Sequence, residues 1–393
     1  MMSFNIHLRN IILLLFLQLP GLYPNALGQI ILKSEKKIPI EDIISYNLAM
    51  LQEDPQNFRA AISLVESYYR VEDYQKSILY ANISEDILMD MLASGNPYDN
   101  HNFYLFYIHQ TRGKARHRLG MFEKALKEYM AAFVLNNSDG DLLIDIGNLY
   151  YNQTNYDSAL YFFRLADAAD SLNFKSKFNI ANVFYVKKNY DSALYYYDKS
   201  VQIKVDFPYA YFYKGCIYNE TENYNLAIDD LNKAINLWPD NPQIFYQRAL
   251  AYFSIEQYQN ALEDWNKVVS LDSVNFEAIR KRIQTNMILK NDRDAITDLD
   301  RLITDNEVEI EAYYLRGNYY LVHNEFQKAL DDFNIALQKG LDYPELYYFA
   351  GYANMKLKNE TEACANYSLA TEGGIELEGK AKRFFLKCLQ EIN

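Results

Sequence analysis

Apolar and polar residues follow a helical pattern along this chain, and the pattern repeats every 34 residues. Its clearest copy is residues 190–194 (YDSAL), where a large apolar residue is followed three and four positions later by Ala and Leu. The alanine recurs in one register at Ala125, Ala159, Ala193, Ala227, Ala261, Ala295, Ala329 and Ala363. A period of this length predicts a stack of supersecondary units that bury their apolar faces against one another.

Other columns of the repeat place small and large residues at fixed positions. Twelve residues before the alanine stands a small residue, as in Gly147 and Gly215. Four residues after the alanine stands a large apolar residue, as in Phe163 and Trp265. Spacings of three, four and seven residues are those of one helix face. Each unit is therefore predicted to be a pair of helices, with small residues where the two backbones approach.

These columns resemble the tetratricopeptide repeat (TPR) family over residues 106–377. Pro239 stands at the family's turn between repeats, and residues 246–249 (YQRA) and 315–318 (LRGN) match its first helix. The resemblance implies an all-α fold, an α-solenoid in which TPR helix-turn-helix repeats form a right-handed superhelix. With a divergent first copy, about nine repeats are expected.

The repeats and their flanks predict the domain organisation. We expect a signal peptide at 1–28, an N-terminal segment with a capping helix at 29–57, a divergent first TPR plus insert at 58–105, eight TPR units of 34 residues at 106–377, and a C-terminal capping helix at 378–393. Asn155, Asn189 and Asn223 recur at the turn inside a unit, where we expect them to hold left-handed backbone.

The first residues have the features of a secretory signal. Arg9 supplies a positive charge, residues 11–19 are an apolar run too short to span a bilayer, and residues 26–28 form a small-residue cleavage site before Gln29. The alternative is an uncleaved anchor. We expect export to the periplasm or secretion from a bacterium, with the ER lumen of a secretory pathway as the alternative.

Charge and cysteine content narrow the function. The net charge of −13 argues against nucleic acid as a partner, because phosphate binding needs a basic surface. Cys216, Cys364 and Cys388 are too few and scattered for a disulfide framework. Cys364 and Cys388 could pair if the last helix folds back, but we favour two small buried hydrophobes.

No catalytic or cofactor motif is found in the sequence, so an enzyme is not expected and neither is a cofactor. His101, His109 and His117 are the one cluster that could bind a metal. Residues eight apart on a helix are about 12 Å apart along its axis, which is too far for two ligands of one metal. We therefore expect ordinary core and surface histidines.

The resemblance implies that two columns of the first helices line a groove for a protein or peptide. The expected groove residues are Ile144, Asn148, Phe178, Asn182, Phe212, Tyr246, Leu250, Arg280, Tyr314, Asn318, Tyr348 and Tyr352, with Gln110 and Lys114 in the same columns. Aromatic residues there can pack a partner's side chains, and amides can bond its backbone. We expect Phe212 and Tyr246 to lie outside the columns that join helix to helix.

Some members of the family bind an acidic C-terminus with a carboxylate clamp, in which a Lys stands four residues before a groove Asn. That clamp is absent here, because Ile144, Phe178 and Tyr314 stand at the Lys position. Acidic pairs such as 229–230, 263–264 and 331–332 recur on the second helices and are predicted to form a solvated face, a basic partner being the minority interpretation.

The first hypothesis for the function is an exported, non-enzymatic TPR scaffold that binds a polypeptide. The second is a co-chaperone-like protein of the secretory pathway without a J-domain, and the third is a metal-binding or enzymatic protein, which no motif supports.

Overall fold

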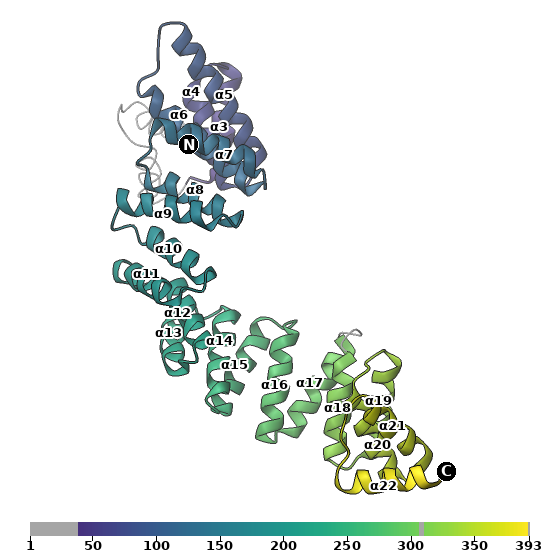
Figure 1. Cartoon of the computed structure of the whole chain (residues 1–393). Coiled ribbons are helices and arrows are strands. Elements are labelled where there is room, and N and C mark those ends of the chain that lie inside the picture. Colours follow the sequence, from purple (N-terminus) through teal and green to yellow (C-terminus); the bar gives the residue numbers. More distant parts are fainter. Residues whose placement is uncertain (1–37, 306–309, 392–393) are drawn as a thin grey trace, which may run out of the picture. The chain divides into compact units, whose positions relative to one another are not determined.

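The computed structural model describes residues 38–305 and 310–391, so the predicted signal peptide lies outside the described residues. Within this part of the chain every regular element is an α-helix, and there are 20 of them. They follow one another as helix-turn-helix pairs (Figure 1). The predicted all-α solenoid fold is thereby confirmed.

The chain forms two compact units, and the boundary falls between Lys187 and Lys188. The first unit contains the helices α3 (Ile40–Glu53), α4 (Phe58–Arg70), α5 (Tyr74–Ala93), α6 (His101–Arg118), α7 (Phe122–Leu135), α8 (Gly140–Asn152), α9 (Tyr156–Ala169) and α10 (Phe174–Val186).

The second unit begins with the helices α11 (Tyr190–Ile203), α12 (Pro208–Glu220), α13 (Tyr224–Leu237), α14 (Pro242–Ser254), α15 (Tyr258–Leu271) and α16 (Phe276–Leu289). It continues with α17 (Asp292–Asp305), α18 (Ile310–Val322), α19 (Phe326–Gln338), α20 (Pro344–Leu357), α21 (Glu360–Glu372) and α22 (Gly379–Glu391).

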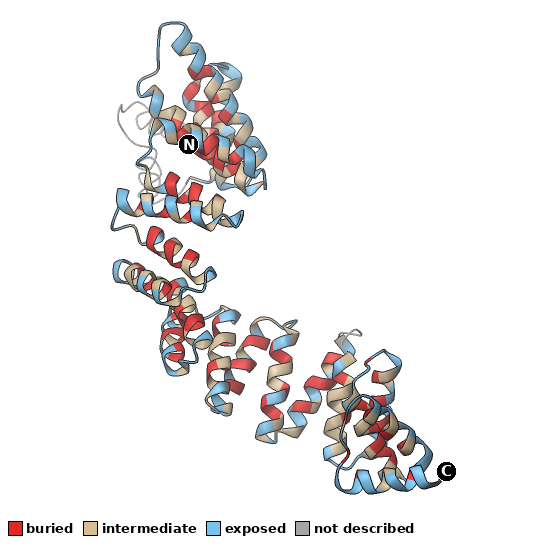
Figure 2. Cartoon of the chain, viewed as in Figure 1, coloured by how far each residue is buried: buried red, intermediate tan, exposed pale blue. Residues whose placement is uncertain are grey.

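The small column exists because a large side chain of the second helix occupies the space that another side chain would need. A Cβ on Gly147 would lie 2.4 Å from the ring of Phe163, and a Cβ on Gly317 would lie 2.5 Å from that of Phe333. Each ring comes from the second helix of the same pair and is fully buried. Buried residues accordingly mark the helix faces that meet a neighbour (Figure 2).

The turn inside each pair differs from the prediction for asparagine. Asn155 and Asn189 have φ of −84° and −88°, and each side chain accepts a hydrogen bond from a backbone N–H of the helix that follows. The left-handed residue is the one before, Thr154 or Lys188. The expectation of left-handed asparagine is wrong, because the side-chain oxygen is needed one position later as a helix N-cap.

The acidic pairs are also not the solvated face that we expected. Asp229 is exposed, but Asp230 is only 4% exposed and is ion-paired with Lys214 at 3.0 Å. Asp264 and Asp332 are buried in the same way, each against an arginine of the preceding helix. Adjacent residues point about 100° apart on a helix, so one acid of each pair faces solvent and the other faces the neighbouring helix.

The insert in the first unit lengthens two helices. The helix α5 has 20 residues and α6 has 18, whereas α8 and α10 have 13 each. Only residues 94–100 connect α5 to α6. Phe58 packs there against Tyr98 and Tyr104, with ring centroids 4.8 and 5.0 Å apart, so the connection is held by aromatic contacts.

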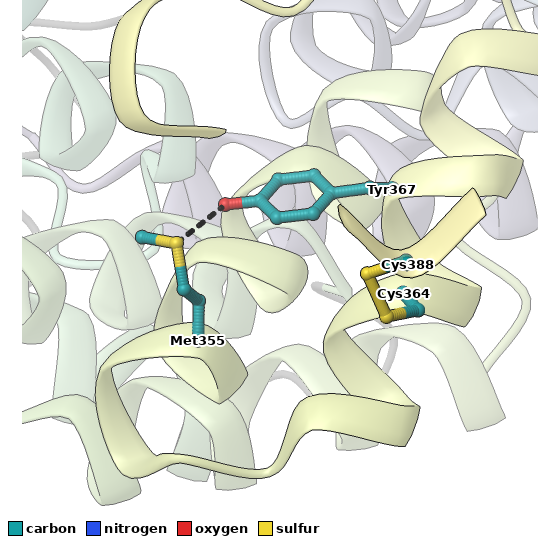
Figure 3. The surroundings of a disulfide bond; sticks show 4 residues. All are labelled: Met355, Cys364, Tyr367 and Cys388. Atoms are coloured by element: carbon teal, nitrogen blue, oxygen red, sulfur yellow. Dashed lines mark hydrogen bonds between the residues drawn. A yellow bond between two sulfur atoms is a disulfide. The ribbon is translucent and has the colours of Figure 1, made fainter. Parts of the chain in front are cut away.

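The last helix is joined to the one before it by a disulfide bond. Cys364 of α21 and Cys388 of α22 are bonded, with their Cα atoms 5.9 Å apart (Figure 3). The preference for two unpaired cysteines is therefore wrong. Phe384 and Phe385 pack against Tyr367, and these contacts fold α22 back far enough for the bond to form.

Candidate functional site

A pocket of about 350 Å³ opens on the first helices of consecutive pairs in the first unit. Its lining residues come from α6, α8 and α10: Lys114, Asp141, Ile144, Asp145, Asn148, Lys175, Phe178 and Asn179. The four residues from α8 are spaced by three, one and three positions, which places them on one helix face. The repeat thus brings one face of each first helix to the same pocket.

An ion pair forms one wall of the pocket. The Lys114 Nζ lies 3.2 Å from Asp145 Oδ2, and the two side chains are 30% and 22% exposed. Burial raises the pKa of Asp145 to about 6, although the Lys114 charge acts in the opposite direction. Burial lowers the pKa of Lys114, but the charge of Asp145, its hydrogen bond and the charge of Asp141 together outweigh burial and leave the pKa raised. The pair is charged at neutral pH, and the carboxylate is poorly compensated.

Amides and apolar groups complete the pocket. The Asn179 Nδ2 donates a hydrogen bond of 3.2 Å to the Asn148 Oδ1. Ile144 is buried, at 6% exposed, and Phe178 is partly exposed at the edge of the same lining. The pocket therefore combines charge, amide groups and an aromatic face, which are the groups that contact a polypeptide chain.

Three of the predicted groove residues meet in this pocket, namely Ile144, Asn148 and Phe178. Asn182 lies one turn further along α10 and is partly exposed. Asp141, Asp145, Lys175 and Asn179 were missed, because they stand beside the two columns taken from the repeat and not in them. Each of them stands three residues before or one residue after Ile144 or Phe178. This spacing could have identified them, since neighbours on one helix face share its surroundings.

The predicted groove residues of the second unit lie in its core more than we expected. Tyr246 meets the ring of Trp265 edge-on at 5.2 Å, and Leu250 packs against the same buried cluster. Phe212 packs against the cluster around Leu231. The expectation that Phe212 and Tyr246 do not join helix to helix is wrong, because rings this large reach the second helix of their own pair.

The remaining predicted residues of the second unit have distinct surroundings. Tyr314 packs against Phe333 and Phe349, and Tyr348 packs against Tyr367. The ring centroids of Tyr352 and Phe326 are 6.4 Å apart. Arg280 forms ion pairs with Glu277 and Glu311. Asn318 Oδ1 is closed off from solvent and accepts no hydrogen bond in the described residues.

A second cavity, of about 590 Å³, lies where the insert joins α5 to α6. Met89, Leu92, His101 and Phe103 are among its lining residues. Met89 and Leu92 are 47% and 45% exposed. None of the predicted groove residues lines this cavity.

Two of the three histidines that we weighed as metal ligands, His109 and His117, are hydrogen-bonded to other side chains. The His109 Nδ1 lies 2.7 Å from Glu128 Oε2, and the His117 Nε2 lies 3.0 Å from Asn152 Nδ2. Among residues 38–305 and 310–391, no group of three His, Cys, Asp or Glu side chains is placed to hold a metal ion. In the same part of the chain, no helix has the length and apolar character needed to cross a membrane.

Family models match most of the repeat region. A model described as "Tetratricopeptide repeat" matches residues 144–210, 293–344 and 314–374, a second one with the same description matches 242–275, and one described as "TPR repeat" matches 215–256. Together these matches span more than half of the chain. The chain is a tetratricopeptide repeat protein.

Several solved structures are similar to this TPR protein. A tetratricopeptide repeat protein from Parabacteroides merdae is 18% identical with a TM-score of 0.44, and covers 63% of this chain and 98% of its own. The pilF protein of Pseudomonas aeruginosa is 15% identical with a TM-score of 0.49, and the match covers 55% of this chain and 99% of pilF. YrrB, titled a TPR protein with an unusual peptide-binding site, is 21% identical with a TM-score of 0.38, and the match covers 44% of this chain and 89% of YrrB. No curated protein matches the chain.

Proposed function

We propose that this TPR protein is an exported, non-enzymatic scaffold that binds a polypeptide partner on the first helices of its repeats. The pocket on α6, α8 and α10 carries this proposal, since it places Asn148, Asn179 and Phe178 beside the charged pair of Lys114 and Asp145. Amides that are not fully used inside the protein can bond a partner's backbone, while an aromatic face packs its side chains.

Membership of the TPR family supports a protein or peptide as the ligand and a scaffold in place of an enzyme. The groove residues of the second unit, such as Tyr314, Asn318 and Tyr352, are partly exposed and extend the proposal to that unit. Each unit then offers its own contact surface.

The disulfide bond between Cys364 and Cys388 supports export. Disulfides persist in the periplasm, outside the cell and in the ER lumen, and are rare in reducing compartments. We propose the periplasm or the bacterial exterior, with the ER lumen and a co-chaperone-like role as the second candidate. N-terminal sequencing of the exported protein tests this: a chain that begins at Gln29 agrees, and membrane-bound material with an intact Met1 contradicts it.

Capture of partners from a native extract tests the binding surface. The parent protein, a double variant with Asn148→Ala and Phe178→Ala, and a Tyr161→Ala control are compared. Tyr161 lies on the second helix α9 and is 59% exposed, outside the pocket. We expect one polypeptide set to bind the parent and the control and to be lost with the double variant. Equal binding by all three proteins would mean that the pocket is not the contact surface.

A further inference from the structure

The pocket of the first unit contains an acid whose charge is incompletely matched. Asp145 Oδ2 is closed off from solvent, and its charged partner is the Lys114 ammonium 3.2 Å away. Burial removes the hydration of a carboxylate, and a single ammonium does not replace all the donors that water supplied. An additional donor at this carboxylate would therefore be stabilising.

The charged groups that face Asp145 come from each helix around the pocket. Lys114 of α6 lowers the pKa of the carboxyl, whereas Asp141 and Asp139 at the start of α8 raise it further. Lys175 of α10 is an exposed member of the lining. Burial outweighs the nearby lysine and brings the pKa of Asp145 to about 6, so the ionised form is less favourable here than in water.

We propose that this pocket takes a basic side chain, arginine above lysine, from the polypeptide partner, and that Asp145 is its main contact. This inference rests on the proposed function. A planar guanidinium can donate to a carboxylate while it lies over an aromatic face, and Phe178 belongs to the same lining. The Asn179 side chain donates through Nδ2 to Asn148, which leaves its oxygen to accept from the same guanidinium.

The opposite ligand, a carboxylate, is disfavoured by the same residues. Lys114 is paired with Asp145 and Asp141 is a second acid of the lining, so the exposed Lys175 is the remaining cation there. The net charge of −13 also favours the approach of a basic partner over an acidic one.

Binding of short acetylated and amidated peptides, measured by calorimetry on the full chain, tests the proposal. Three peptides share a Gly-Ser-Ala background and differ at one central residue, which is arginine, its neutral analogue citrulline, or glutamate. We expect the arginine peptide to bind about tenfold more tightly than the other two at neutral pH. This advantage should disappear in Asp145→Asn and be unchanged in Asp229→Asn, which removes an exposed charge of the second unit.

Acidification of the parent protein gives a readout that needs no variant. The advantage of the arginine peptide should decrease as the pH is lowered through about 6, because Asp145 takes up a proton there. Equal binding of the three peptides overturns the arginine pocket but leaves polypeptide binding in place. Tighter binding of glutamate also overturns it, and absence of binding by all three contradicts the proposed function as well.

Discussion

Arg248 and Asp264 lie 16 residues apart on the two helices of one repeat and are joined by two parallel hydrogen bonds. The Arg248 Nε donates to Asp264 Oδ2 at 2.8 Å, and its Nη2 donates to Oδ1 at 2.6 Å. The same guanidinium donates through Nη1 to Asn232 of the preceding repeat. One arginine thus links three helices.

Other repeats carry a cation and an acid at the same two positions. The pairs at this spacing are Arg112 with Glu128, Lys214 with Asp230, Arg282 with Asp298, and Arg316 with Asp332. Where the cation is missing the acid is missing too, as in Ile146 with Phe162. These repeats therefore carry either both charges or neither at the two positions.

Breaking this pair should be strongly destabilising. In Asp264→Leu the largely buried Arg248 keeps its charge without a carboxylate partner, and we expect a loss of about 3 kcal/mol, seen as a lower urea midpoint. The double variant Arg248→Ile with Asp264→Phe copies the apolar pair of another repeat and should recover most of that loss. Glu263→Gln, which changes the exposed neighbour, should be near neutral. A double variant no more stable than Asp264→Leu would show that the pair cannot be replaced.

Asp145 gives the first unit an unusual dependence on pH. Its pKa is raised from 3.8 to about 6, so between these values the folded chain binds more protons at this site than the unfolded chain. The contribution of Asp145 to stability therefore falls as pH rises through this window. We expect Asp145→Asn to be more stable than the parent at neutral pH, on the order of 2 kcal/mol, and equal to it near pH 4. A less stable variant at neutral pH would mean that the ion pair with Lys114 outweighs burial.

A glycine should relieve strain at the turn of the pair formed by α8 and α9. Thr154 has φ of 60°, a left-handed conformation that a β-branched residue rarely adopts. We expect Thr154→Gly to raise the free energy of unfolding by about 1 kcal/mol. Gln153→Gly is the control, because Gln153 has φ of −86° and gains no such relief. The same effect at both positions would rule out backbone strain as the cause.

Reduction of the disulfide should loosen α22 and leave the repeats folded. The bond closes a separation of 24 residues, which corresponds to about 3 kcal/mol in the chain-entropy estimate. Limited proteolysis with and without reductant should show faster cleavage within Gly379–Glu391 after reduction. Cys364→Ser with Cys388→Ser should behave as the reduced protein does, whereas Cys216→Ala should still respond to reductant. Unchanged protection after reduction would mean that the contacts of Phe384 and Phe385 alone hold α22.

The repeat made the fold predictable because its constraint is local and recurs. Gly147 and Phe163 stand at the same offset as Gly317 and Phe333, so one packing contact was visible in several copies. The disulfide could not be inferred in this way, since it depends on how α22 folds back after the last repeat. The burial of Asp230 was missed although its spacing from Lys214 recurs in other repeats.

The candidate site was predictable only in part. The repeat columns gave Ile144, Asn148 and Phe178, because α8 and α10 present the same face to the pocket. Asp145 and Lys175 lie outside those columns, and their inclusion depends on how neighbouring helices are rotated against each other. A 34-residue spacing does not specify that rotation.

Site-specific photo-crosslinking tests the central claim most directly. A photoreactive phenylalanine analogue is placed at Phe178, in the pocket, or at Tyr161, which is exposed on α9 of the same unit. The protein is irradiated in its native extract, and the crosslinked residues of the partner are mapped. We predict an adduct with one polypeptide at position 178, next to a basic residue of that partner, and none at position 161. An adduct at position 161 alone, or no adduct at either position, would contradict the account.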